Sequence, residues 1–255
     1  MNPTACTGAG PGATGGTSRT GAGADATTNR ATTGAVTGAE GEAVGAVTLL
    51  VIAKEPLPGR VKTRLTPPFT PQEAARLAEA SLADTLRTVL ALPAARRVLV
   101  LDGAPGPWLP PGIEVVGQCA GGLDERLAAA FGGCTGPTLL IGMDTPQITA
   151  ADLAPALSPG SWDGCDAWFG PAEDGGFWAL GLAEPDPELL RGVPMSVPET
   201  GAVQRRRLVE AGLTVRDLPR LRDVDTAADA VDVAALAPHG RFAAVLAALT
   251  GAVAR

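Results

Sequence analysis

The sequence has 255 residues and a formal net charge of −7, from 20 lysine and arginine residues against 27 aspartate and glutamate residues. An acidic excess with no basic face to offset it argues against a general nucleic-acid-binding protein. The four cysteines are widely spaced and form no Cys-x-x-Cys pair, so neither a zinc site nor a disulfide framework is indicated. The single histidine, His239, leaves little material for a catalytic triad or a multi-histidine metal site. Any metal is therefore expected to be a hard cation held by carboxylates.

Residues 1–45 consist largely of threonine, alanine and glycine and show no apolar periodicity. A segment of this composition cannot bury enough apolar surface to offset the entropy of the chain, so we expect a disordered tail. The remaining residues, 46–255, suit one folded domain. The tail lacks the apolar core of a signal peptide, and no later run reaches membrane-spanning length. These features predict a cytoplasmic protein without a membrane span.

The first predicted strand is the apolar run Val47–Ala53, whose β-branched residues are typical of a buried strand in a parallel sheet. The run leads into a loop that carries four cationic residues and a turn glycine: Lys54, Gly59, Arg60, Lys62 and Arg64. Such a loop can present positive charge and backbone N–H groups to phosphates. Both lysines of the chain lie here, which favours a role for a compact, mobile ammonium. An ordinary solvated loop is the alternative.

Strands and helices alternate through the rest of the chain. A capping box, Thr70 with Glu73, predicts a helix from Pro71 to about residue 92. Further helices are expected near residues 121–131, 149–158, 187–191 and 200–211, after residue 226, and at 242–253. Further strands are expected at residues 97–102, 113–116, 137–142, 166–169, 177–182 and 213–218. This alternation predicts a doubly wound, mostly parallel α/β sheet, with an antiparallel pair around Asp174.

Carboxylates follow two of the predicted elements. Asp144 comes directly after an apolar strand, where open α/β sheets place ligand groups. It could hold Mg²⁺ beside phosphates, or it could make a turn hydrogen bond. Asp223 and Asp225 alternate, so both side chains point the same way in an extended segment, which favours a second metal ligand. Thr226 and Asp229 also fit a helix N-terminal box, which Asp225 could merely support.

The loop Glu173-Asp174-Gly175-Gly176 is a further candidate. Its two glycines permit a tight turn or the close approach of a substrate. Asp174 could bind an acceptor hydroxyl or act as a base, whereas the competing interpretation is a hairpin with Asp-Gly turn chemistry. Arg126 could reach a phosphate, but an exposed helical charge is the favoured interpretation for that residue.

Five segments occur in the order that is typical of one family: AKEPLPGRVKTRL (53–65), GGLDERL (121–127) with Gln118 before it, GMDTP (142–146), GPAEDGGFWALGL (170–182) and DVDTAAD (223–229). The sequence thereby resembles the bacterial DUF2064 family, glycosyltransferase-like proteins associated with radical-SAM and arsenosugar gene clusters. It is also similar to the wider nucleotide-diphospho-sugar transferase (GT-A) superfamily, which includes the molybdenum-cofactor and phospholactate guanylyltransferases. The resemblance covers about residues 46–240, and the first and fourth segments are the specific ones. The family commonly has glycine where this chain has Asp124.

The resemblance implies a single GT-A-like, Rossmann-like three-layer domain over residues 46–255, with nucleotide at the carboxyl ends of its first strands. The candidate nucleotide-binding residues are Lys54, Gly59, Arg60, Lys62, Arg64, Gly175 and Gly176. Asp144 and Asp225 would hold Mg²⁺ or Mn²⁺. Asp174, facing the acceptor, and Lys62 are the candidate catalytic residues. Transfer from a nucleotide needs the charge of the leaving group neutralised and has little need for a histidine.

The leading functional prediction is a metal-dependent glycosyltransferase that acts from a nucleotide sugar on a small-molecule acceptor. The alternative is a nucleotidyltransferase that joins a nucleoside triphosphate (NTP) to a phosphorylated or acidic acceptor and releases pyrophosphate. Four cations within the eleven residues 54–64 suit a triphosphate. A third hypothesis, a non-catalytic nucleotide-binding module, predicts binding without turnover. Fold analogy alone does not separate the three.

Overall fold

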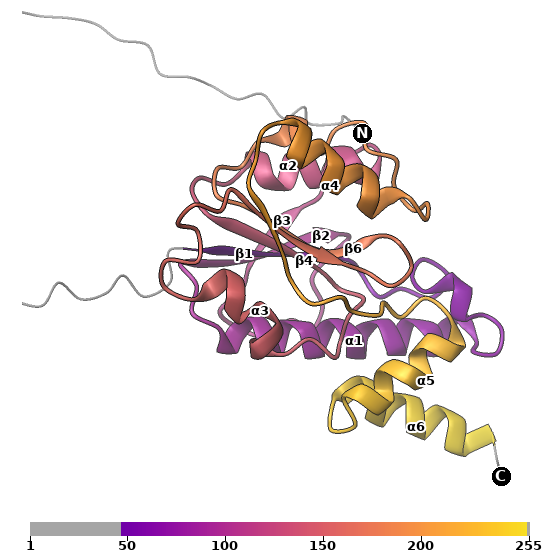
Figure 1. The fold of residues 1–255 in the computed structure, drawn as a ribbon. Coiled ribbons are helices and arrows are strands. Elements are labelled where there is room, and N and C mark those ends of the chain that lie inside the picture. Colours follow the sequence, from indigo (N-terminus) through magenta and orange to yellow (C-terminus); the bar gives the residue numbers. More distant parts are fainter. Residues whose placement is uncertain (1–46, 254–255) are drawn as a thin grey trace, which may run out of the picture. The chain divides into compact units, whose positions relative to one another are not determined.

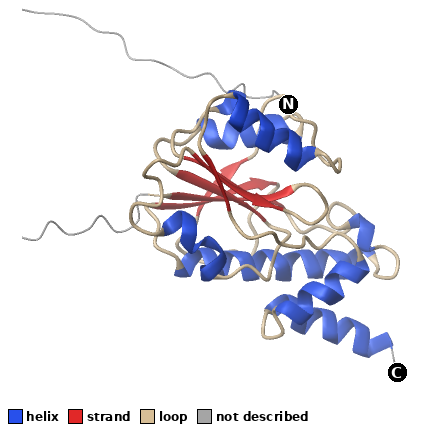
Figure 2. Cartoon of the chain, in the orientation of Figure 1, coloured by secondary structure: helices blue, strands red, loops and turns tan. Residues whose placement is uncertain are grey.

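The computed structural model describes residues 47–253. A seven-stranded sheet, with strand order β3-β2-β1-β4-β6-β5-β7, lies between two layers of helices (Figure 1 and Figure 2). The strands are β1 (Thr48–Lys54), β2 (Arg96–Asp102), β3 (Glu114–Gly117), β4 (Thr138–Gly142), β5 (Ala167–Pro171), β6 (Phe177–Leu182) and β7 (Val215–Asp217). The α-helices are α1 (Pro71–Ala91), α2 (Leu123–Gly132), α3 (Ala150–Leu157), α4 (Thr200–Glu210), α5 (Ala227–Leu236) and α6 (Arg241–Val253). Short 3₁₀ helices cover Thr63–Leu65 and Pro187–Leu189. The predicted three-layer α/β class is confirmed.

The sheet is mostly parallel. Strand β1 lies between β2 and β4 and runs parallel to both, and β3 and β7 are parallel to their neighbours β2 and β5. Strand β6 runs antiparallel to both β4 and β5, so the predicted antiparallel addition around Asp174 is present. Because β1, β2 and β4 are parallel, the loops that follow them leave from one edge of the sheet.

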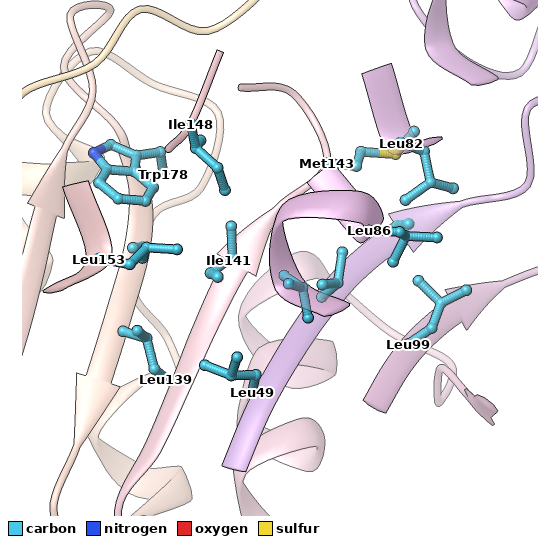
Figure 3. Close-up of a cluster of buried hydrophobic side chains, with 14 of the residues drawn as sticks. Leu49, Leu82, Leu86, Leu99, Leu139, Ile141, Met143, Ile148, Leu153 and Trp178 are labelled. Carbon is cyan, nitrogen blue, oxygen red and sulfur yellow. The ribbon is translucent and has the colours of Figure 1, made fainter. Parts of the chain in front are cut away.

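The two faces of the sheet carry separate apolar cores. Leu49 and Val51 of β1 belong to the core beneath α1 and α3, whereas Leu50 belongs to the core beneath α2 and α4. This explains why the run is apolar without alternation. Figure 3 shows the first core, in which fully buried leucines and isoleucine of the sheet meet α1 and α3: Leu49, Leu82, Leu86, Leu139, Ile141 and Leu153. Each such side chain stabilises the fold by roughly 1.5–3 kcal/mol.

Helix α1 begins as predicted, with Thr70 and Glu73 forming a reciprocal capping box. On its outer side, α1 packs against α5 and α6 in a third apolar cluster. That cluster contains residues of four other segments: Leu65, Phe69, Val224, Val233, Phe242 and Leu246. The loop after β1 and the segment before α5 are therefore held by one small core.

Several expectations need correction in detail. Lys54 is the last residue of β1 rather than part of the loop, and the predicted strand 213–218 forms only the short β7. All four residues of β3 are exposed at the edge of the sheet. The predicted tail, residues 1–45, lies outside the described residues. Among residues 47–253, no helix has the length and apolar character needed to cross a membrane.

Candidate active site

A cavity of about 860 Å³ opens beyond the carboxyl ends of β1 and β4. Residues of all five sequence segments line it, so loops far apart in the chain meet there. Among the predicted site residues, those that line the cavity are Lys54, Arg60, Lys62, Arg64, Asp144, Asp174, Gly176 and Asp225. Gly59 and Gly175 lie outside this lining. The position is the one where open α/β sheets bind ligands.

The loop after β1 presents its cations in two different ways. Arg60 and Arg64 have side chains that are 58% and 68% exposed, whereas that of Lys62 is only 7% exposed. Gly59 has a φ of 75° and turns the chain. Lys62 also has a left-handed backbone, with φ 48°, which is costly for a residue with a side chain and concentrates at functional sites. The loop therefore directs one ammonium inward and two guanidinium groups outward.

Lys62 joins the two predicted metal carboxylates. Its Nζ atom is 2.5 Å from Asp144 Oδ1 and 3.9 Å from Asp225 Oδ1, and it donates a hydrogen bond to the carbonyl of Val224. The other Asp225 oxygen accepts from Arg64 Nη1 at 3.0 Å. The Val224 N–H donates to the carbonyl of Asp144 at 2.9 Å, which fastens the segment before α5 to the end of β4. The cationic loop and both carboxylates thus form one group.

Asp223 adds a third carboxylate to this group. Its side chain lines the cavity, and among the described residues its buried Oδ1 has no hydrogen-bond partner. The pKa of Asp223 is raised to about 7, chiefly by burial and then by the negative charges of Asp144 and Asp174, against a lowering effect of Lys62. A buried carboxylate among other acids indicates a place that needs positive charge.

The chemistry of these oxygens fits a hard cation. Asp144 and Asp225, with the unpartnered Asp223 Oδ1 beside them, offer carboxylate donors of the kind that Mg²⁺ and Mn²⁺ take. Within residues 47–253, however, no three acidic, histidine or cysteine side chains are grouped as a preformed metal centre. The nearby positive charges are the Lys62 ammonium on Asp144 and the Arg64 guanidinium on Asp225.

The Asp174 loop is both a turn and part of the cavity wall. Asp174 Oδ1 accepts a hydrogen bond from the Gly176 N–H at 2.8 Å, as the turn interpretation requires. Gly175 has a φ of 91°, and an added Cβ would lie 2.0 Å from the carbonyl oxygen of Pro198. Gly201 N–H donates to the Gly175 carbonyl at 2.8 Å. Gly175 thus serves close backbone packing next to Asp174, which lines the cavity.

The expectation that Arg126 is an exposed helical charge is wrong. Its side chain is 25% exposed, and Nη1 bonds Asp102 Oδ2 at 3.0 Å and Gln118 Oε1 at 3.3 Å. Gln118 Nε2 donates to the carbonyls of Ala53 at 2.8 Å and Val100 at 3.0 Å, so it holds the ends of β1 and β2 together. The glycine pair Gly121 and Gly122 before α2 could have indicated from the sequence that this helix begins at a binding site.

The segment Met195–Pro198 also lines the cavity and was not expected from the sequence. Ser196 in it has a left-handed φ of 59°. Asp124, where the family commonly has glycine, accepts a hydrogen bond from the Gly192 N–H at 2.8 Å. This bond, the largest cause, lowers the pKa of Asp124 below its ordinary value. Asp124 therefore ties α2 to the segment that leads into Met195.

Comparison with known proteins finds one family and several solved structures that resemble this chain. Residues 76–197 match the DUF2064 family, described as uncharacterized and conserved in bacteria. A solved structure from Desulfovibrio desulfuricans G20, of a protein provisionally named a nucleotide-diphospho-sugar transferase, is 27% identical, with a TM-score of 0.64 over 71% of this chain and 83% of that one. No curated protein matches the sequence significantly.

A second solved structure shows the same fold at low identity. It is the CMP:2-keto-3-deoxy-manno-octonic acid synthetase complexed with CTP, at 14% identity and a TM-score of 0.50, with 76% of this chain and 98% of that one covered. The family match leaves out both the cationic loop and Asp225. Residues 76–197 are therefore similar to the DUF2064 family, and the fold is that of the nucleotide-diphospho-sugar transferase superfamily.

Proposed function

We propose that this protein is a metal-dependent transferase that takes its donor group from a nucleotide sugar. The observation that carries the proposal is the group formed by Lys62, Asp144 and Asp225 at the carboxyl ends of β1 and β4, with Arg60 and Arg64 at the mouth. The cavity of about 860 Å³ lies within the range of small-molecule sites. The name of the Desulfovibrio protein, which is 27% identical, points to the same class of reaction.

The cationic residues would bind the phosphates of the donor. Lys54, Arg60 and Arg64 line the cavity with exposed side chains, and Lys62 lies deeper. When a glycosyl group leaves a nucleoside diphosphate, negative charge grows on the departing phosphate. Positive groups placed at that phosphate stabilise the transition state more than the ground state. Lys62 is the best placed of the four because its ammonium is shielded from water.

Asp144 and Asp225 would hold Mg²⁺ or Mn²⁺. Such an ion, when bound, neutralises charge on the diphosphate and orients it. Asp223 lies within the electrostatic reach of Asp144, so the buried carboxylate would strengthen the negative field around the ion. Arg64 orients Asp225 through its 3.0 Å contact.

Asp174 would act on the acceptor. Its carboxylate borders the cavity, and the hydrogen bond from Gly176 fixes the orientation of the carboxylate. A carboxylate held in this way can accept a hydrogen bond from an acceptor hydroxyl and take its proton as the new bond forms. Phe177 and Met195 also line the cavity and would help to exclude water from it.

A nucleotidyltransferase is the second candidate function. Lys54, Arg60, Lys62 and Arg64 all line the cavity, and four cations suit a triphosphate better than a diphosphate. In that reaction the acceptor attacks the α-phosphorus and pyrophosphate leaves. The same Lys62 and carboxylates would then neutralise the pyrophosphate.

Calorimetry with a panel of NTPs, nucleoside diphosphates and sugar nucleotides, with and without Mg²⁺ or Mn²⁺, tests the proposal. Metal-dependent binding of one sugar nucleotide, lost in Asp144→Asn, is the expected result. Release of nucleoside diphosphate would identify glycosyl transfer, and release of pyrophosphate would identify nucleotidyl transfer. Binding that survives Asp144→Asn and Asp174→Asn without turnover would identify a binding module. No binding of any nucleotide would refute the assignment.

A further inference from the structure

The Lys62 ammonium lies where the oxygens of the site converge. Nζ is 2.5 Å from Asp144 Oδ1 and 3.9 Å from Asp225 Oδ1, and it donates to the Val224 carbonyl. Carboxylate and carbonyl oxygens are also the ligands of Mg²⁺, which binds them at roughly 2.0–2.1 Å. One ammonium therefore faces three oxygens that a hard cation would use.

Lys62 and a divalent cation compete for the same negative charge. The Lys62 side chain is only 7% exposed, so little water screens its attraction to Asp144. Arg64 already engages the second oxygen of Asp225 at 3.0 Å. An ion on Asp144 would meet the ammonium at close range, and the two positive charges would repel each other. Binding of the ion to Asp144 would therefore weaken the hold of the ammonium on this carboxylate, and the ammonium would weaken the binding of the ion.

The Lys62 side chain can leave the carboxylates while its backbone stays in place. The backbone is fixed at φ 48° and ψ 38°, and its carbonyl accepts from the Leu65 N–H at 2.9 Å. The side chain is a flexible four-carbon stem with a compact charge. Lys62 also lines the cavity beside Arg60 and Arg64. Rotation of the stem would carry the ammonium from the carboxylates toward the phosphate-binding side.

We propose that Lys62 is an exchangeable internal cation, which neutralises Asp144 and Asp225 in the free protein and moves to the donor phosphates when a divalent cation binds. The second half of the exchange rests on the proposed function, because it requires a phosphate ligand. The first half, competition between Lys62 and the metal, requires only the carboxylates. Metal and nucleotide then strengthen each other's binding, and the coupling is reciprocal.

The chain has two lysines, which makes the exchange directly observable in the wild-type protein. Protein labelled with ¹³Cε-lysine should give two side-chain NMR signals, assigned with Lys54→Arg and Lys62→Arg. On addition of Mg²⁺ alone, the Lys62 signal should shift and the Lys54 signal should stay. On further addition of the nucleotide that calorimetry selects, the Lys62 signal should shift again. A Lys62 signal that stays fixed at Mg²⁺ concentrations that saturate the protein in calorimetry would overturn the proposal.

A second test measures Mn²⁺ affinity without nucleotide by electron paramagnetic resonance. Lys62→Met removes the competing charge and should bind Mn²⁺ about tenfold more tightly than the wild type. Lys54→Met, a matched change at an exposed lysine outside the carboxylate group, should bind Mn²⁺ within about twofold of the wild type. If Lys62→Met binds Mn²⁺ no more tightly than the wild type does, the proposed exchange is refuted but the proposed metal site is not.

The same titrations separate this proposal from the proposed function. If neither the wild type nor Lys62→Met binds Mn²⁺, both the exchange and the metal dependence of the transferase are refuted. Nucleotide binding in the calorimeter then decides whether a metal-independent transferase site remains. If Lys62→Met gains Mn²⁺ affinity but no nucleotide binds to the wild type, the competition is upheld and the nucleotide assignment fails.

Discussion

Asp84 is a buried carboxylate that serves a helix far away in the sequence. Its side chain is 1% exposed and lies in α1. Oδ1 accepts from the Arg241 N–H at 3.0 Å and Oδ2 accepts from the Phe242 N–H at 2.8 Å, so Asp84 caps the start of α6. Arg87 lies 2.9 Å from Oδ1. Because α6 also covers Phe69 and Val224 in the third apolar cluster, this cap is expected to matter for the site.

Asp84→Ala should lower the free energy of unfolding by about 3 kcal/mol. Hydrogen bonds to charged groups contribute about 1.5–3 kcal/mol each, and two are lost while the Phe242 N–H stays buried. The Arg87 side chain is 64% exposed, so its ion pair adds less than about 1 kcal/mol. The substitution also removes the free-energy cost of burying the carboxylate charge, which offsets part of this loss. With a urea m-value of about 2–3 kcal/mol/M, the midpoint should fall by about 1–1.5 M.

Urea unfolding followed by circular dichroism checks this value. Asp152→Ala is the matched control, because Asp152 caps α3 through Thr149 at an exposed helix start. The control should cost about 1 kcal/mol or less. If Asp84→Ala shifts the midpoint by no more than the control does, the view that α6 is anchored through this carboxylate is incorrect. Loss of nucleotide affinity in Asp84→Ala under native conditions would show that the anchor also supports the site.

Four further changes test the core, the site, one loop and the first turn of α2. Leu86→Ala, in the core of Figure 3, should cost about 2–5 kcal/mol in urea unfolding. Asp144→Asn should weaken metal-dependent nucleotide binding by at least about tenfold in calorimetry, with an unchanged dichroism spectrum. Gly175→Ala should lower the thermal midpoint by several degrees, because its Cβ would lie 2.0 Å from a backbone oxygen at a φ of 91°. Asp124→Asn should be less stable than the wild type at neutral pH, because a carboxyl with a lowered pKa stabilises the fold above its ordinary pKa. The difference should shrink as the pH falls through the lowered pKa of Asp124, and a difference that is unchanged in acid would contradict this.

The sequence predicted those parts of the fold that depend on neighbours in the chain. The apolar run of β1 and the Thr70 capping box are local patterns, and both gave the right elements. The meeting of Lys62 with Asp144 also followed, because the ends of parallel strands share one edge of a sheet. This general rule of sheet topology was enough to predict that the two residues lie close together.

The parts that were missed depend on contacts between distant residues. Arg126 was expected to be exposed because no neighbouring residue in the sequence indicates its partner Asp102, which lies 24 positions earlier. Asp84 has no local signature as a cap, since the helix that it serves begins 157 positions later. The left-handed backbone of Lys62 was not predicted from the sequence either, because non-glycine residues adopt this conformation only where tertiary contacts enforce it.

Val224 shows why stability and ligand binding should be linked in this protein. Its side chain is fully buried in the third cluster, and its N–H and carbonyl reach Asp144 and Lys62. The residues on either side of it, Asp223 and Asp225, are two of the acidic residues of the site. Local opening of α5 and α6 would therefore release Val224 and disperse these carboxylates while the sheet stays folded. Changes in this small core should weaken metal and nucleotide binding before they unfold the domain.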